Sequence, residues 1–372
     1  MSSLDWVAQV PADLQKLVTT LRGRPDFPRN LARLSRRLRK AKPELSEAAE
    51  LLAEQARLMS PVDPVVREET EWFFARRVPR WHFLIVNDKT RNDVYREALQ
   101  RHVKPGMVVL EIGTGTGLLA MLAARLGAGH VYTCESEPLM AEVARDNIAR
   151  NGLADRITVI GKRSDRMKLG TDLAERADLL VSEIVDNDLL GEHILASMTD
   201  AWARLLNPGA IVLPDQIGLR GAVVGGEAWS SGFRTPGYDG LDLSAVERLA
   251  PPRLPMPQSM RDNDFISDDV TVLHYDLSVP ARSYRTGRGT FVARARRAGT
   301  ADGFLHWLWL RFGPELEFTN RPPIESAWAP IIHAFPKRVA VVAGDELAMA
   351  VSADADGVRI WHETAGGEGL KD

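Results

Sequence analysis

The sequence predicts an α/β fold in which a helical N-terminal extension precedes a parallel-sheet domain and an antiparallel β domain. Three observations support this prediction. Apolar residues recur at helical spacing before about residue 70, and from about Val103 short apolar runs alternate with helical stretches, as in βαβ units. Beyond Asn207-Pro208-Gly209, apolar runs are separated by turns and no such alternation follows. With 372 residues, the chain is long enough for two or more domains.

Composition and charge exclude several classes of protein. Apolar residues make up 45% of the chain, which excludes disorder as its main state. The formal charge of -3 supplies no basic field that would attract a nucleic acid. The sequence also contains no uninterrupted run of about 18 apolar residues, the length that a membrane-spanning helix needs. Cys134 cannot form an internal disulfide alone, and residues 1–10 lack the basic stretch of a signal peptide. We therefore expect a cytoplasmic protein that binds neither nucleic acid nor membrane.

The extension, residues 1–70, is rich in Leu, Ala, Arg and Glu and predicts two or three helices. It contains a basic run from Arg33 to Lys42. This run could be an arm that grips nucleic acid, or a solvated helix face beside neighbouring glutamates. The absence of interleaved aromatic residues favours the solvated face.

The next domain, predicted for residues 71–208, contains a series of strands and helices. The expected strands are Met107–Leu110, His130–Cys134, Ile157–Ile160 and Leu179–Val181, and the expected helices are Leu118–Leu126 and Pro138–Arg150. The last domain, residues 209–372, has expected strands at Phe304–Phe312 and Val339–Val342. Within it, residues 225–264 are dense in Gly and Pro and form an insertion.

A glycine-rich loop follows the first expected strand of the parallel sheet. Glu111 ends this strand, and Gly113, Gly115 and Gly117 follow it ahead of a helix. Glycines allow a tight turn and the close approach of a ligand to the backbone. Glu135 ends the next strand, where its carboxylate can accept hydrogen bonds from both hydroxyls of a ribose. This order of elements predicts a nucleoside site.

The spacing of the glycines bears on which nucleoside is bound. It departs from the G-x-G-x-x-G pattern of dinucleotide sites. S-adenosylmethionine suits the loop best, because it carries a sulfonium and an amino acid but no phosphate. Ser164 and Asp165 follow the third strand, where an adenine edge would be read. An ordinary capped turn explains these two residues equally well.

The fourth strand leads into a loop with four acidic residues, Glu183, Asp186, Asp188 and Glu192, and no basic one. Two carboxylates can hold a planar guanidinium through its five donors. Placing that cation about 4 Å from a sulfonium costs roughly 4 kcal/mol at an effective dielectric near 20, which two glutamates would offset. One acid, or a neighbour reached through water, must accept the proton released on methyl transfer. The alternatives are a solvated loop, or a divalent metal site that uses Asp186 and Asp188.

These motifs resemble those of the arginine N-methyltransferase family. The resemblance rests on Glu111–Gly117, Glu135, Glu183 and Glu192. Trp81-His82-Phe83 and residues 87–96 are most similar to the monomethylating, type III, branch. The similarity covers roughly residues 72–340, with the separate motifs in family order.

For the cofactor, the resemblance implies that Arg91 binds the carboxylate of S-adenosylmethionine and that Glu135 binds its ribose. Ser164 and Asp165 would contact the adenine. The reaction would leave S-adenosylhomocysteine and would need no metal.

For the acceptor, the resemblance implies that Glu183 and Glu192 clamp the guanidinium and that Trp328 forms a wall of the site. The family has a histidine directly before this tryptophan, and Ala327 stands there instead. Ala327 suggests an inactive scaffold as one alternative. The retained pair of glutamates argues against it, because buried like charges strain each other.

The family fold implies a Rossmann-like domain, a β-barrel and a homodimer made by an arm, for which residues 225–264 are the candidate. Two acceptors fit the resemblance: free L-arginine, as in relatives from bacterial natural-product pathways, and arginine within a peptide. The weak net charge favours free L-arginine, since it gives little attraction for Arg-rich protein tails.

Overall fold

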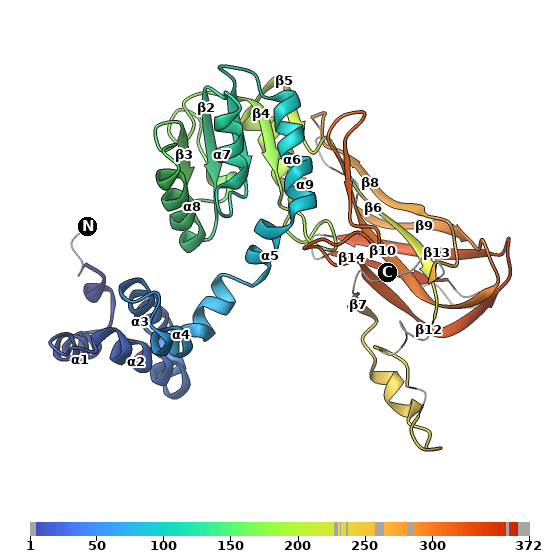
Figure 1. The fold of residues 1–372 in the computed structure, drawn as a ribbon, viewed down its shortest axis with the longest axis horizontal. Helices are drawn as coiled ribbons and strands as arrows, with labels where there is room; N and C mark the ends of the chain where they lie inside the picture. Colours follow the sequence, from blue (N-terminus) through green and yellow to red (C-terminus); the bar gives the residue numbers. More distant parts are fainter. Residues whose placement is uncertain are drawn as a thin grey trace. The chain divides into compact units, whose positions relative to one another are not determined.

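The protein is described by a computed structural model that covers residues 5–226, 230, 232–235, 237–256, 264–280, 284, 286–354 and 357–363 (Figure 1). Its contacts divide the chain into two compact units, Met1–His82 and Phe83–Asp372. Within these described residues, the helices are too short or too polar to cross a membrane.

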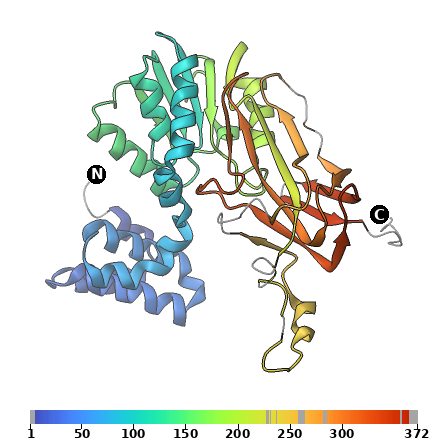
Figure 2. The same ribbon diagram turned by 45° about the vertical axis from the view of Figure 1, so that its right-hand side comes forward.

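The first unit is a helical bundle with its own core (Figure 2). Its described elements are η1 (Asp5–Gln9), α1 (Ala12–Arg22), α2 (Phe27–Ala41), η2 (Pro43–Leu45), α3 (Ser46–Met59) and α4 (Pro64–Arg77), and α5 (Trp81–Asn87) begins at its end. The sequence predicted two or three helices up to residue 70, which lies inside α4. The Asp63 carboxylate starts α4 by accepting hydrogen bonds from the amides of Val65 and Val66 at 2.9 and 3.0 Å.

The basic run lies at exposed positions along α2 and just beyond its end. Two of its members contact α4 of the same unit. Arg36 pairs with Glu69 at 3.1 Å, and the guanidinium of Arg39 lies 4.6 Å from the centre of the Trp72 ring. The run therefore forms a solvated helix face, part of which packs within the bundle.

The second unit begins with a doubly wound parallel sheet. The elements are α6 (Lys89–His102), β1 (Val108–Ile112), α7 (Leu118–Arg125), β2 (His130–Cys134), α8 (Pro138–Arg150), β3 (Ile157–Ile160), η3 (Ser164–Arg166), β4 (Ala177–Ser182), α9 (Ile194–Arg204) and β5 (Leu206–Leu213). The strand order is β3-β2-β1-β4-β5. The order reverses between β1 and β4, and ligands of such sheets bind outside the carboxyl ends of the strands at this switch point.

One expected boundary was wrong. Asn207-Pro208-Gly209 does not separate elements but lies inside β5. The pairing of β4 with β5 shifts register between Ala177 and Leu179, and Gly209 takes a φ of 77°. The turn-forming residues therefore mark an irregular strand here.

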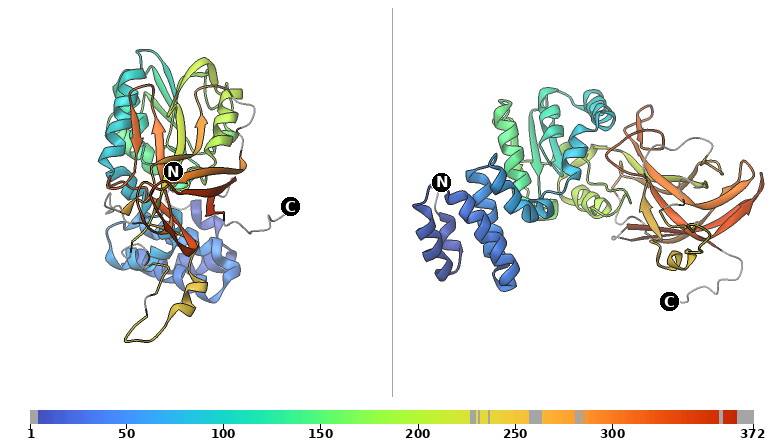
Figure 3. Two further views of the ribbon diagram at one scale, coloured as in Figure 1. Left: turned by 90° about the vertical axis from the view of Figure 1, so that its right-hand side faces the viewer. Right: turned by 60° about the horizontal axis from the view of Figure 1, so that its bottom comes forward.

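The rest of the second unit consists of antiparallel strands. The order in one sheet is β7-β12-β10-β6-β8, with β11 beside β10, and in the other β14-β13-β9. The bounds are β6 (Gln216–Val224), η4 (Ser244–Leu249), β7 (Arg253–Pro255), β8 (Val270–Asp276), β9 (Gly287–Arg294), β10 (Gly299–Arg311), β11 (Glu317–Thr319), β12 (Ile331–Val341), β13 (Glu346–Asp354) and β14 (Gly357–His362). β14 lies against β12 and β9 against β8, so the two sheets close on each other as the predicted barrel (Figure 3).

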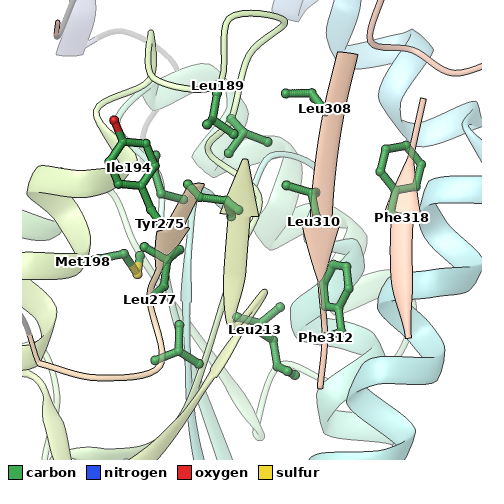
Figure 4. Close-up of a cluster of buried hydrophobic side chains, with 14 of the residues drawn as sticks. Leu189, Ile194, Met198, Leu213, Tyr275, Leu277, Leu308, Leu310, Phe312 and Phe318 are labelled. Carbon is green, nitrogen blue, oxygen red and sulfur yellow. The ribbon is translucent and has the colours of Figure 1, made fainter. Parts of the chain in front are cut away.

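The parallel sheet and the barrel share one hydrophobic core. In Figure 4, Leu213 and Ile194 from the sheet domain lie near Leu277, Leu308 and Phe312 of the barrel. Leu189, from the loop after β4, is fully buried in this cluster. The acidic loop is therefore anchored in the core between the two domains.

Candidate functional site

The glycine loop leaves β1 at the switch point with three glycines in the left-handed region. The φ values are 86° at Gly113, 52° at Gly115 and 86° at Gly117. A Cβ atom added at Gly113 would lie 2.5 Å from the side chain of Ile184. Only glycine allows the two loops, one after β1 and one after β4, to approach this closely.

Two predicted cofactor residues hold the glycine loop in place. Glu111 is buried, and its Oε2 accepts hydrogen bonds from the hydroxyls of Thr114 at 2.8 Å and Thr133 at 2.6 Å. Burial raises its pKa to about 7 despite these bonds. Glu135 accepts from the amide of Gly115 at 3.0 Å and from that of Glu137 at 2.9 Å. Glu135 therefore lies directly at the glycine turn.

Arg91 and Glu183 form a buried ion pair. The Nη2 of Arg91, on α6, lies 2.5 Å from the Oε2 of Glu183, and their side chains are only 4% and 9% exposed. The Nε of Arg91 and the Oε1 of Glu183 are buried without a hydrogen-bond partner within the described structure. Such atoms are rare in native proteins and are the positions that a bound ligand would satisfy.

Burial and like charges make the glutamates hard to ionise. The pKa of Glu183 is raised to about 7, mainly by burial, although Arg91 opposes the shift. The pKa of Glu192 is raised to about 8 by burial and then by the negative charges of Glu183, Asp186 and Glu135. Three of these acids belong to one loop, and Glu135 directly follows the end of β2. The site thus gathers acidic groups whose charged form a bound cation would stabilise.

The other two acids of the loop have partners within the protein. Asp186 accepts a hydrogen bond from the amide of Gly191 at 3.1 Å, which closes the loop on itself. Asp188 pairs with Arg253 at 2.7 Å. Across the described residues, His, Cys, Asp and Glu side chains form no group of three that could hold a metal ion.

The loop that contains Trp328 is tied to both α6 and the acidic loop. Asp88 starts α6 and accepts hydrogen bonds from the hydroxyl of Ser326 at 2.6 Å and the amide of Ala327 at 2.8 Å. Trp328 is 4% exposed, and its indole N–H donates to the carbonyl of Val185 at 3.0 Å. The tryptophan therefore supports the backbone of the acidic loop.

Ser164 and Asp165 lie in η3, after β3, two strands from the switch point. Ser164 is buried, and the side chain of Asp165 is half exposed beside Arg163, at 3.4 Å. Asp165 acts on the pKa of Cys134, at the end of β2, together with Glu135. The two acids therefore lie on the same edge of the sheet.

Sequence reasoning missed the role of Asp88, which connects the start of α6 to the loop before Trp328. Its Oδ1 accepts from the amide of Arg91 at 2.9 Å, while its Oδ2 binds the loop before Trp328. The only local signal was that of a helix N-cap ahead of a polar turn. The long-range bonds come from residues more than 200 positions away and have no local pattern.

Comparisons with known proteins place this site in context. A family model described as ribosomal protein L11 methyltransferase (PrmA) matches residues 94–216. The chain is 36% identical over 315 residues to the arginine N(omega)-methyltransferase of Streptomyces achromogenes subsp. streptozoticus, which covers 82% of this chain and 86% of that protein. It is 30% identical over 321 residues to protein arginine N-methyltransferase 7 of Danio rerio, covering 78% of this chain but 47% of that protein.

Two solved structures have a similar fold. The Trypanosoma brucei PRMT1 enzyme-prozyme heterotetrameric complex with AdoHcy aligns with a TM-score of 0.65 at 20% identity, covering 78% of this chain and 96% of that one. Arabidopsis thaliana protein arginine methyltransferase 10 aligns with a TM-score of 0.62 at 21% identity, covering 75% and 89%.

The raised pKa of Glu192 predicts a pH-dependent stability. Between about pH 5 and 8 the folded protein keeps a proton on Glu192 that the unfolded chain has released, so the free energy of unfolding falls as pH rises. Glu192→Gln removes this equilibrium. The free energy of unfolding of both proteins can be measured with urea at several pH values. The wild-type value minus the variant value should decrease as pH rises over this range. For Glu175→Gln, at an exposed position, the difference should stay constant. A constant or increasing difference for Glu192→Gln would contradict the raised pKa.

Proposed function

The chain belongs to the arginine N-methyltransferase family, and we propose that its acceptor is free L-arginine, which receives a single methyl group on a guanidinium nitrogen. The methyl donor is S-adenosylmethionine, and the co-product is S-adenosylhomocysteine. The observation that carries the proposal is the buried ion pair of Glu183 with Arg91, in a loop that also holds Glu192, where burial raises the pKa of both glutamates.

The residues around the switch point fit the donor. The turn at Gly115 has open space where a side chain would stand, and the Nε of Arg91 is a buried donor without a partner within the described structure. When bound, S-adenosylmethionine supplies an electrophilic methyl group on a sulfonium. Arg91 would hold its carboxylate and Glu135 its ribose, with Ser164 and Asp165 at the adenine. The loop itself is shaped by Glu111, Gly113, Gly115 and Gly117.

The acidic loop would bind and orient the acceptor. A guanidinium between Glu183 and Glu192 replaces the water that burial has removed, and its charge lowers both pKa values. Two carboxylates fix the plane of the guanidinium and thereby aim one nitrogen. One of the two carboxylates, or a neighbour reached through water, would accept the proton released from that nitrogen. Trp328 would hold the acidic loop in place through the bond from its indole N–H to the carbonyl of Val185.

The choice of free arginine rests on the comparisons and on charge. The Streptomyces relative, which aligns over most of both chains, carries the name arginine N(omega)-methyltransferase. Arginine within a peptide is the second candidate, because the Danio relative is a protein arginine N-methyltransferase. Addition of one methyl group, rather than two, follows from the similarity of residues 81–96 to the type III branch.

A homodimer formed through the insertion is also part of the proposal. Its described residues expose large apolar side chains, such as Tyr238 at 78% and Leu249 at 77%. Exposed apolar surface of this kind is typical of an interface. Residues 227–229, 231, 236 and 257–263 of the predicted arm lie outside the described residues. The cytoplasmic location stays a prediction from the sequence.

The acceptor can be identified by its products. We expect the protein with labelled S-adenosylmethionine to form monomethylarginine from free L-arginine, and little product from a Gly-Arg-rich peptide. Mass spectrometry of both reactions distinguishes the two candidates. Preferential methylation of the peptide would overturn the assignment of free arginine, and dimethylated product would overturn that of a single transfer.

Removing one carboxylate should abolish most of the turnover. Glu192→Gln should lower kcat for arginine by at least about 100-fold, the scale of losing one preorganised electrostatic contact. Affinity for S-adenosylmethionine should change little, because the buried partner of Arg91 is Glu183. Glu175→Gln, which removes an exposed charge, is the matched control. Near-normal kcat for Glu192→Gln would exclude the guanidinium clamp.

Changing the acid at the end of β2 should weaken binding of the donor. Glu135→Gln keeps an oxygen that can accept from a backbone amide but loses the charge for the ribose hydroxyls. The dissociation constant for S-adenosylmethionine, measured by calorimetry, should rise by about tenfold or more. Glu142→Gln, exposed on α8, serves as the control. An unchanged dissociation constant in Glu135→Gln would rule out the ribose assignment.

A further inference from the structure

A chain of three hydrogen bonds crosses the barrel and ends at the acidic loop. The rings of His306, on β10, and His333, on β12, are both buried. The amide of Ile360, on β14, bonds to Nδ1 of His333 at 3.2 Å. Nε2 of His333 lies 2.9 Å from Nδ1 of His306, and Nε2 of His306 lies 3.0 Å from the carbonyl of Asn187.

The two ends of this chain fix its direction. The amide of Ile360 can only donate, so Nδ1 of His333 accepts and its Nε2 carries the hydrogen. The carbonyl of Asn187 can only accept, so Nε2 of His306 carries a hydrogen and its Nδ1 accepts from His333. Every bond is satisfied when both rings are neutral Nε2–H tautomers. A second proton on either ring would break this chain, because each Nδ1 already faces an N–H group.

The surroundings agree with neutral rings. Burial lowers the pKa of His306 to about 4, and the pKa of His333 is well below its ordinary value. The charged groups that act on the pair are Asp186, Asp188 and Arg253. Asp188 Oδ1 is 3.7 Å from Nε2 of His306, too far for a hydrogen bond, and its other oxygen pairs with Arg253.

The bonded carbonyl lies in the middle of the loop that carries the two glutamates. Asn187 stands between Glu183 and Glu192 in the sequence, and its side-chain oxygen also accepts from the amide of Ala329 at 3.0 Å. Asn187 is therefore held by the barrel domain through both its backbone carbonyl and its side-chain oxygen. Loss of the donor would leave a half-buried carbonyl without its protein partner, and the loop could restore a bond to this carbonyl only by moving or by admitting water.

We propose that His306 is a positioning residue, which sets the geometry of Glu183 and Glu192 by holding the Asn187 carbonyl, and that His333 fixes the tautomer in which it does so. This inference rests on the proposed function, since it takes the two glutamates as the acceptor clamp. His306 contacts no reacting atom, and its effect on methyl transfer passes through the backbone of the loop.

Two variants of His306 separate positioning from packing. His306→Phe keeps a ring of similar shape but loses the N–H donor. We expect kcat for arginine methylation to fall by about tenfold or more, with the dissociation constant for S-adenosylmethionine unchanged. His306→Gln has an oxygen that can accept from His333 and an NH2 group that can donate to Asn187, so it should restore most of kcat. Unchanged kcat in His306→Phe, or no recovery in folded His306→Gln, would overturn the proposal.

Two further measurements do not depend on activity. Side-chain 15N NMR of the wild type at pH 7 should show both histidines as neutral Nε2–H tautomers, and a charged or Nδ1–H His306 would contradict the proposal even if His306→Phe fails to fold. Hydrogen exchange of residues 184–192 should be faster in His306→Phe than in the wild type, and equal exchange would count against it. If the wild type methylates neither arginine nor peptide, the proposed function fails, while these two measurements still test whether His306 holds the loop.

Discussion

The burial of two carboxylates at the switch point of the parallel sheet is the constraint on which the site depends. Glu183 follows β4 and Glu192 lies further along the same loop, and both lose water without gaining enough partners. Arg91 compensates one of them only in part, since an oxygen of Glu183 and a nitrogen of Arg91 stay unpaired within the described structure. An acid in this state is stabilised by an added cation, which is the property that a guanidinium site needs.

A loop that holds like charges together must be fixed by the rest of the protein. Leu189 anchors it in the core shared by the sheet and the barrel, and Trp328 donates to the carbonyl of Val185. From the barrel, His306 donates to the carbonyl of Asn187, and Arg253 pairs with Asp188. The barrel thus serves the chemistry of the sheet domain, because three of its segments stabilise one loop that the sheet alone would leave free to move.

The sequence predicted those parts of the site whose residues are neighbours along the chain. The glycine loop with Glu111 and the loop from Glu183 to Glu192 follow strands in a regular order, so spacing alone indicated them. The pairing of Arg91 with Glu183 and the bonds of Asp88 and His306 join distant segments, and nothing local marks them. The irregular strand β5 was missed for a related reason, since its pairing with β4 overrides the turn preference of its Pro and Gly.

In the proposed site, Arg91 would connect the donor and acceptor halves through charge. It already pairs with Glu183, and its free Nε is directed to no other protein group within the described structure. If the carboxylate of the donor pairs with Arg91, then the two negative charges of Glu183 and Glu192 are balanced by the positive charges of the sulfonium and the acceptor guanidinium. Without the donor, Arg91 competes with the acceptor for Glu183. If Arg91 binds the donor as proposed, its guanidinium would weaken the acceptor site until the donor is present, and this would favour binding of the donor before arginine.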